Sequence, residues 1–169
     1  MKGQFSFEQI ISLIVFISFA SYIFFVVFSQ VPVYISEIRN EELRSEAYQI
    51  SELLINDPGS PPDWYKAGRT LVRIGLSNET ENKTNYVLTD KLNKLDSICR
   101  TGGYQTIKTA IDTDYEFSIN ITGSELCPSI KIDCRPTPPY RSKVSSAIIR
   151  RLFAIDQGSC YAELVLEIW

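Results

Sequence analysis

The sequence contains no histidine among its 169 residues. Histidine is the commonest general base, the usual partner of serine and cysteine nucleophiles, and a frequent metal ligand. Without it, acid–base chemistry falls to the carboxylates alone, and no motif pairs them for that purpose. We therefore expect a protein that is not an enzyme and that carries neither a metal nor a cofactor.

Charge is missing from a long stretch near the N-terminus, since no charged residue occurs from Gln9 to Ser36. A helix needs about 20 apolar residues to cross the hydrocarbon core of a bilayer, which is roughly 30 Å thick. The run from Ile10 to Val33 meets this requirement. A cleaved secretory signal has a basic start and an apolar stretch of about 7–15 residues, whereas here Glu8 precedes a longer run. We expect a retained transmembrane segment at residues 9–34.

An excess of positive charge is also lacking. Lysine and arginine number 17 against 20 aspartate and glutamate residues, so the net charge is −3. This balance predicts no nucleic-acid partner. The one basic cluster comprises Arg141, Lys143, Arg150 and Arg151, and we expect these side chains to line the solvated face of a strand.

The leader before the apolar run carries a pattern made of Lys2, Gly3, Gln4, Ser6 and Glu8. This Lys-Gly-Gln-x-Ser-x-Glu pattern resembles the leader of archaeal type IV pilin-like precursors, which have a class III signal peptide. The resemblance implies that a prepilin peptidase cuts between Gly3 and Gln4 and removes residues 1–3. It also implies that Glu8 becomes the fifth residue of the mature chain, where pilins carry a glutamate facing the N-terminal amine of a neighbouring subunit.

Glu8 has a physical reason for such a partner. A carboxylate at the edge of hydrocarbon is costly unless it is paired. In a helical filament, the new amine of Gln4 on an adjacent chain would be that partner. The alternative is a hydrated Glu8 among lipid headgroups, where it only marks the start of the helix.

Three glycosylation sequons lie beyond the apolar run, with Asn78, Asn82 and Asn120 as acceptors. Such sequons are used on the extracytoplasmic side of a membrane. Lys2 precedes the apolar run, and a cation there favours a cytoplasmic N-terminus. Both observations predict a single-pass precursor with its C-terminal part outside the cell.

Four cysteines follow the apolar run, at Cys99, Cys127, Cys134 and Cys160. An even number fits two disulfides in an oxidising compartment, and three pairings are open. Cys127 and Cys134 are near enough in sequence to close a loop. A zinc site is disfavoured, because the tight cysteine or histidine spacing of such sites is absent.

Hydrophobic periodicity predicts an α+β fold, and the resemblance of the leader implies that this fold has the type IV pilin-like form. The apolar helix should continue over residues 4–57 and end in the proline- and glycine-rich stretch after Asn56. The rest, residues 58–169, should form a head in which a small antiparallel sheet packs on that helix. The expected elements are helices at 90–98, capped by Thr89, and at 104–111, and strands at 115–122, 130–134, 144–155 and 160–168.

These expectations together indicate a structural, pilin-like subunit, with a minor pilin favoured over the major one, in an archaeal surface filament concerned with assembly or adhesion. Its partners would be other pilin subunits, the prepilin peptidase, the membrane platform for pilus assembly, and the lipid bilayer before assembly. The alternative function is that of an unprocessed, single-pass membrane-anchored protein whose extracellular head binds a ligand.

Overall fold

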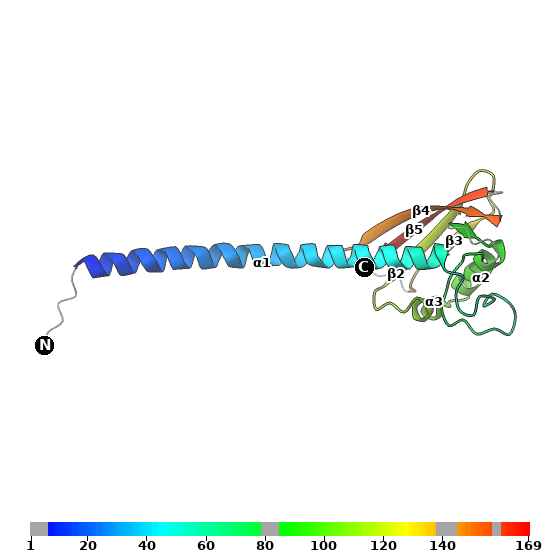
Figure 1. The fold of residues 1–169 in the computed structure, drawn as a ribbon, viewed down its shortest axis with the longest axis horizontal. Coiled ribbons are helices and arrows are strands. Elements are labelled where there is room, and N and C mark those ends of the chain that lie inside the picture. Colours follow the sequence, from blue (N-terminus) through cyan, green and yellow to red (C-terminus); the bar gives the residue numbers. More distant parts are fainter. Residues whose placement is uncertain (1–6, 79–84, 138–144, 157–159) are drawn as a thin grey trace. The chain divides into compact units, whose positions relative to one another are not determined.

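The computed structural model describes residues 7–78, 85–137, 145–156 and 160–169 (Figure 1). Gly3, Gln4 and Asn82 lie outside these residues. The chain divides into two units, an N-terminal unit of residues 1–39 and a C-terminal unit of residues 40–169. One helix, α1 (Phe7–Asn56), begins in the first unit and ends in the second.

In the N-terminal unit, α1 consists of apolar side chains interrupted by a few hydroxyls and amides. Ser18, Ser29 and Ser36 each donate a hydroxyl hydrogen bond of 2.8 Å to a carbonyl three or four residues earlier in the same helix. Hydrocarbon offers no partner for polar groups, so these hydroxyls are satisfied within the helix itself. The described start at Phe7 and the end at Asn56 agree closely with the helix expected over residues 4–57.

The C-terminal unit is an α+β domain. After α1 it contains β1 (Tyr86–Val87), α2 (Thr89–Arg100), α3 (Tyr104–Ile111), β2 (Phe117–Gly123), β3 (Lys131–Cys134), β4 (Ala147–Ile155) and β5 (Cys160–Ile168). The five strands form one sheet in the order β1-β4-β5-β2-β3. The two helices and four longer strands follow the periodicity of the sequence, with boundaries shifted by a few residues.

The sheet is mixed, which corrects the expectation of a purely antiparallel one. β4, β5, β2 and β3 are antiparallel neighbours, but β1 pairs with β4 in parallel through Tyr86 opposite Ala154 and Val87 opposite Ile155. A strand of two residues has no periodicity to detect. Backbone hydrogen bonds to residues 76–78 hold it in place: Asn78 N–H donates to Tyr86 C=O at 3.1 Å, and Leu88 N–H donates to Leu76 C=O at 3.0 Å.

The core lies between the second half of α1 and one face of the sheet. Leu43, Ala47, Ile50 and Leu54 recur at intervals of four and three residues and are buried, so they form one stripe along the helix. The sheet covers this stripe with alternating residues of its strands, of which the largest are Phe117, Ile119, Ile121, Phe153, Leu164, Leu166 and Ile168. This packing explains why only the second half of α1 belongs to the domain.

The N-terminus of α2 is held by a distant residue. We expected Thr89 to cap this helix, but Thr89 is its first residue and Leu88, the residue before it, provides no side-chain hydrogen bond. Instead, the Asp156 carboxylate accepts hydrogen bonds from both the backbone N–H and the hydroxyl of Thr89. A carboxylate at this position also complements the helix dipole.

Lys91 is the one lysine among the buried residues of the C-terminal unit that the structure describes. Its ammonium donates to the carbonyls of Pro58 and Ser77, each at 2.8 Å. Both carbonyls belong to the loop between α1 and β1, so this cation ties the loop to α2. A buried ammonium needs such partners to offset its loss of hydration.

Candidate functional site

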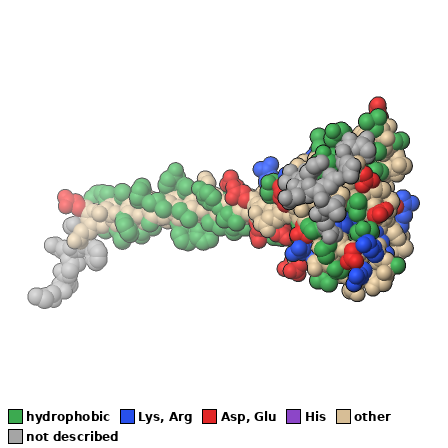
Figure 2. All heavy atoms as spheres, turned by 45° about the vertical axis from the view of Figure 1, so that its right-hand side comes forward, with side chains coloured by type: hydrophobic (Ala, Val, Ile, Leu, Met, Phe, Trp, Pro, Cys, Tyr) green, Lys and Arg blue, Asp and Glu red, His purple; other side chains and the backbone are tan. Residues whose placement is uncertain are grey.

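The first candidate site is the apolar surface of α1 in the N-terminal unit. Within residues 7–39 every side chain is exposed, including Phe16, Phe25 and Phe28. Figure 2 shows hydrophobic side chains along this segment, with acidic residues at its beginning and after its end. The helix is long enough to cross a membrane, and an 18-residue window of it has a mean hydropathy of 2.7. Such a surface is unstable in water and requires either lipid or other apolar helices.

Glu8 is the second residue of α1 and lies in its first turn. A carboxylate is favoured there, because the N-terminal end of a helix carries a partial positive charge. Its side chain is exposed, so it is available to a partner outside the chain. Gly3 and Gln4, the predicted cleavage residues, fall outside the described part, and the proposed cut stays a prediction.

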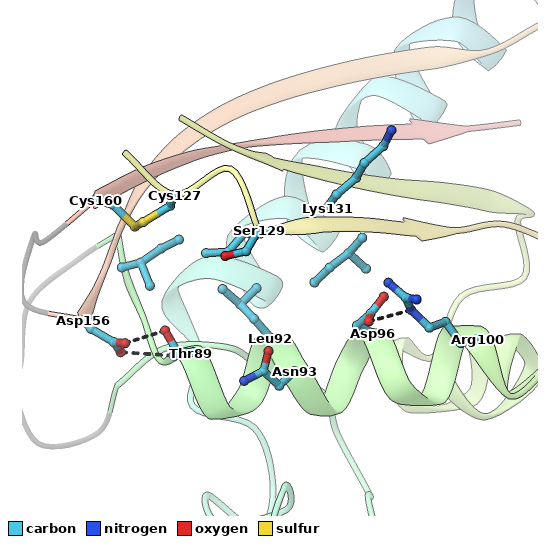
Figure 3. Close-up of a pocket in the computed structure, with 13 residues that line it drawn as sticks. Thr89, Leu92, Asn93, Asp96, Arg100, Cys127, Ser129, Lys131, Asp156 and Cys160 are labelled. Carbon is cyan, nitrogen blue, oxygen red and sulfur yellow. Dashed lines mark hydrogen bonds and ion pairs between the residues drawn. A yellow bond between two sulfur atoms is a disulfide. The ribbon is translucent and has the colours of Figure 1, made fainter. Parts of the chain in front are cut away.

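The second candidate site is a cleft in the C-terminal unit, between α2 on one side and β3 with its preceding loop on the other (Figure 3). It encloses about 380 Å³. Its floor is aliphatic and its rim is polar. The floor contains Leu92, Ile130, Ile132 and Ile155, and the rim contains Thr89, Asn93, Asp96, Arg100, Ser129, Lys131 and Asp156.

The carboxylates of this cleft are both engaged. Asp156 accepts the hydrogen bonds from Thr89, and Asp96 forms an ion pair with Arg100 at 2.7 Å. The hydrogen bond with Asp96 raises the pKa of the exposed Arg100 guanidinium. Neither acid is poised as a general acid or base, since such a group has to reach a proton of the substrate. The cleft is thus suited to binding a small polar group on an aliphatic floor.

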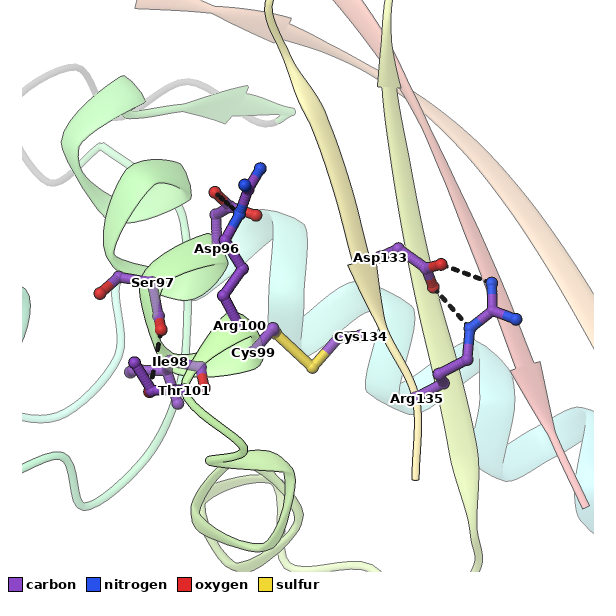
Figure 4. Close-up of a disulfide and its surroundings, with 9 residues drawn as sticks. All are labelled: Asp96, Ser97, Ile98, Cys99, Arg100, Thr101, Asp133, Cys134 and Arg135. Carbon is purple, nitrogen blue, oxygen red and sulfur yellow. Dashed lines mark hydrogen bonds and ion pairs between the residues drawn. A yellow bond between two sulfur atoms is a disulfide. The ribbon is translucent and has the colours of Figure 1, made fainter. Parts of the chain in front are cut away.

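Two disulfides fix the walls of this cleft. Cys99 of α2 is bonded to Cys134 of β3, with a Cα–Cα distance of 5.1 Å, and so links the helix and the strand that flank the cleft (Figure 4). Cys127 is bonded to Cys160 at the start of β5, with a Cα–Cα distance of 6.2 Å. The four expected cysteines therefore form two disulfides, and Cys127 and Cys134 do not close a local loop. Cys134 bonds instead to α2, and Cys127 bonds to the start of β5.

A polar network lies at the edge of the core between α3 and β2. Tyr104 donates its hydroxyl to Glu116 at 2.6 Å, and Lys108 donates to the other oxygen of the same carboxylate at 2.7 Å. Burial raises the pKa of Glu116, but the hydrogen bonds from Lys108 and Tyr104 outweigh it and hold that pKa below its ordinary value. Burial, followed by the bond to Glu116, raises the pKa of Tyr104. The network connects helix and sheet.

Arg151 corrects one expectation about the basic cluster. It lies on the core side of β4, where it pairs with Glu52 of α1 and its guanidinium sits 5.1 Å from the ring centroid of Tyr48. The bond from Arg151 is the largest cause that lowers the pKa of Glu52. Arg150 alone is described on the solvated face as expected, and Arg141 and Lys143 lie outside the described residues.

The sequons differ in their surroundings. Asn78 is partly buried, and its backbone N–H donates to Tyr86 C=O at 3.1 Å. Asn120 is part of β2, and its Oδ1 accepts a hydrogen bond of 3.1 Å from the Thr122 hydroxyl of the same sequon. Modification at these asparagines stays a prediction.

Sequence reasoning located the apolar helix and the four cysteines but missed the cleft and the partners Asp156 and Glu52. No local signal marks these two carboxylates, because each partner is more than sixty residues away in sequence. Among the described residues, no group of three or more histidine, cysteine, aspartate or glutamate side chains is arranged to hold a metal ion. No protein-family model, no curated protein and no solved structure matches this chain.

Proposed function

We propose that this chain is a pilin-like structural subunit of an archaeal type IV pilus-like surface filament. One observation carries the proposal. The apolar surface of α1 in the N-terminal unit is fully exposed around the helix, although the C-terminal unit has a hydrophobic core of its own. An apolar helix attached to a self-sufficient domain needs an external apolar partner, and the pilin-like leader favours other copies of the same helix.

The proposed assembly begins with a membrane precursor whose N-terminus is cytoplasmic and whose C-terminal unit is outside the cell. The prepilin peptidase cuts between Gly3 and Gln4, and the assembly platform moves the helix from lipid into the filament. There the Ile10 to Val33 segments pack against each other, and the Glu8 carboxylate pairs with the Gln4 amine of a neighbour. We favour a minor, adhesive or initiating subunit, because the domain carries two disulfides and a cleft in addition to its sheet.

The direct test is the intact mass and N-terminal sequence of the protein from host membranes and from sheared surface material. The proposal predicts an N-terminus at Gln4 and its presence in the sheared fraction. An N-terminus at Met1, confined to membranes, would refute it.

A matched pair of variants tests the role of Glu8. We expect Glu8→Ala to be processed normally but to accumulate in the membrane, because the carboxylate no longer pairs at the edge of the apolar segment. Glu37→Ala removes the charge at the other end of the uncharged run and should assemble as the unaltered protein does. Recovery of Glu8→Ala in filaments at the normal level would contradict the proposed pairing.

A second function is favoured by the cleft between α2 and β3. Its aliphatic floor and polar rim suit an unprocessed membrane-anchored protein that binds a ligand outside the cell. That function needs the transmembrane helix only as an anchor, so it predicts that Glu8→Ala has no effect on the protein's location or abundance.

A further inference from the structure

The face of the sheet that points away from the core presents an apolar area and a glycosylation acceptor side by side. We call it the outer face. The strand register assigns to it Ser118, Asn120 and Thr122 of β2, Tyr161, Glu163, Val165 and Glu167 of β5, and Ile148, Arg150 and Leu152 of β4. In this register Asn120 lies opposite Val165, and Val165 lies opposite Arg150.

Large apolar side chains on the outer face are unusually open to solvent. Ile148 is 56% exposed, Leu152 is 74% exposed and Tyr161 is 57% exposed. A solvated sheet face normally alternates to polar residues, as the β2 part of this face does. Leu152 and Tyr161 lie close together on two paired strands, whereas Arg150, which is ion-paired with Glu163, separates Leu152 from Ile148. Exposed side chains of this size on one face indicate a surface that is covered by something else.

The Asn120 side chain is arranged as a glycan acceptor. Its Oδ1 accepts the 3.1 Å hydrogen bond from the Thr122 hydroxyl, which leaves Nδ2, the atom that a saccharide would occupy, without a hydrogen bond in the described residues. Because residues two apart in a strand point the same way, both side chains of the sequon project from the outer face. A saccharide on Nδ2 begins next to Val165 and lies over the neighbouring strands β5 and β4.

We infer that Asn120 carries an N-linked saccharide and that this saccharide covers the apolar part of the outer face. Ile148 and Leu152 on β4 flank the row that contains Asn120, Val165 and Arg150. Tyr161 follows on β5, beyond Glu163, which pairs with Thr122. Sugar rings have apolar C–H faces that stack on aromatic rings, and Tyr161 offers such a ring. The inference rests on the extracellular position in the proposed function but not on filament assembly.

The modification is a group transfer from a lipid-linked saccharide, made by a membrane transferase. A bond forms between Asn120 Nδ2 and the anomeric carbon of the sugar, and the bond from that carbon to the phosphate oxygen of the lipid carrier breaks. The lipid phosphate leaves with the electron pair, and the amide gives up one proton.

The first test is mass spectrometry of the full chain purified from membranes of its own host, without reduction. The expected result is a saccharide on the peptide that contains Asn120, together with both disulfides. Disulfides with an unmodified Asn120 would overturn the inference and leave the proposed function intact. Free thiols at all four cysteines with an unmodified Asn120 would overturn both, because the domain would then not have reached an oxidising compartment.

The second test asks whether the saccharide covers the face. Thr122→Val removes the hydroxyl of the sequon but keeps the shape and strand preference of the side chain, and Thr122→Ser is the matched control that keeps the sequon. Chemical nitration of tyrosine is measured in both. Tyr161 should be nitrated several-fold faster in Thr122→Val than in Thr122→Ser, while Tyr48, which lies on α1 and is 51% exposed, should not change. Equal nitration of Tyr161 in the two variants would overturn the covering role.

Discussion

The two parts of α1 have different relations to their surroundings, although they belong to one helix. Residues 9–36 carry no charge and are exposed around the whole circumference, whereas residues 40–56 carry a single buried stripe with charged residues beside it. The second pattern belongs to a helix that packs on a sheet in water. The first belongs to a helix whose entire surface is solvated by hydrocarbon or by other helices. The pattern of apolar residues around a helix thus indicates its environment more directly than its total hydropathy does.

Reduction of the disulfides should produce the largest difference between the two parts: it should destabilise the C-terminal unit and leave the membrane association of the apolar segment unchanged. Each native disulfide of a small extracellular domain contributes about 2–5 kcal/mol, and the C-terminal unit has two. We expect a reducing agent to lower the urea midpoint of the domain greatly, as followed by tryptophan fluorescence. The same treatment should leave the protein in the membrane fraction, since the cysteines all lie outside the apolar segment. Loss of membrane association on reduction would show that the two parts are not independent.

Truncation of one apolar side chain in each part sharpens the comparison. Leu54 is fully buried, so Leu54→Ala should destabilise the domain by about 2–5 kcal/mol. Phe25 is 73% exposed in the N-terminal unit, and Phe25→Ala should leave the unfolding of the domain unchanged. Urea unfolding of both variants in detergent micelles measures the difference. Equal effects would mean that the buried stripe does not extend as described.

An arginine placed inside or just beyond the uncharged run tests where the membrane-spanning part of α1 ends. Val26 lies inside the uncharged run, and Val26→Arg should cost membrane insertion about 3 kcal/mol. Ile38→Arg adds the same charge beyond Glu37, where it should cost little. The fraction of protein that resists alkaline extraction from membranes provides the measurement. If both variants remain equally resistant, the assigned boundaries of the segment are incorrect.

The smallest expected effect concerns pH and the C-terminal unit alone. The pKa of Glu116 is lower in the folded protein than its reference value of 4.5, so its contribution to stability is present above that value and is lost as the pH falls through the folded pKa. We expect Glu116→Gln to cost about 1–3 kcal/mol at pH 7. The variant should also lose less stability than the unaltered protein between about pH 5 and 3. Parallel curves of stability against pH would assign the acid response to other carboxylates.

The features that sequence reasoning located depend on neighbours in the chain. Every second residue of β5 is apolar and buried, namely Cys160, Ala162, Leu164, Leu166 and Ile168. This alternation can be read from the sequence of the strand alone. The uncharged run is visible in the same way. The helix at Tyr104–Ile111 followed from such signals together with the glycine pair before it.

The features that were missed depend on contacts between distant segments. Thr89 is a residue type that often caps helices. Here Asp156 accepts the hydrogen bond at the helix start instead, because the end of β4 approaches the start of α2. Arginine is usually a surface residue, but Arg151 lies on the core side of β4, where it pairs with Glu52 and contacts the ring of Tyr48. The disulfide pairing likewise follows from the position of β3 at the sheet edge. Each of these contacts requires the fold to be known first.

The placement of the two disulfides has a mechanical consequence. The loops that they close overlap and together extend from Cys99 to Cys160, so pulling on the chain cannot lengthen this part beyond the crosslinks. Residues 40–98 are outside both loops, so no disulfide holds α1 to the sheet; its buried stripe and the contacts of Arg151 with Glu52 and Tyr48 do so. Tension applied through α1 would therefore peel this helix away first, while the crosslinked sheet keeps its shape and provides a template for the helix to return.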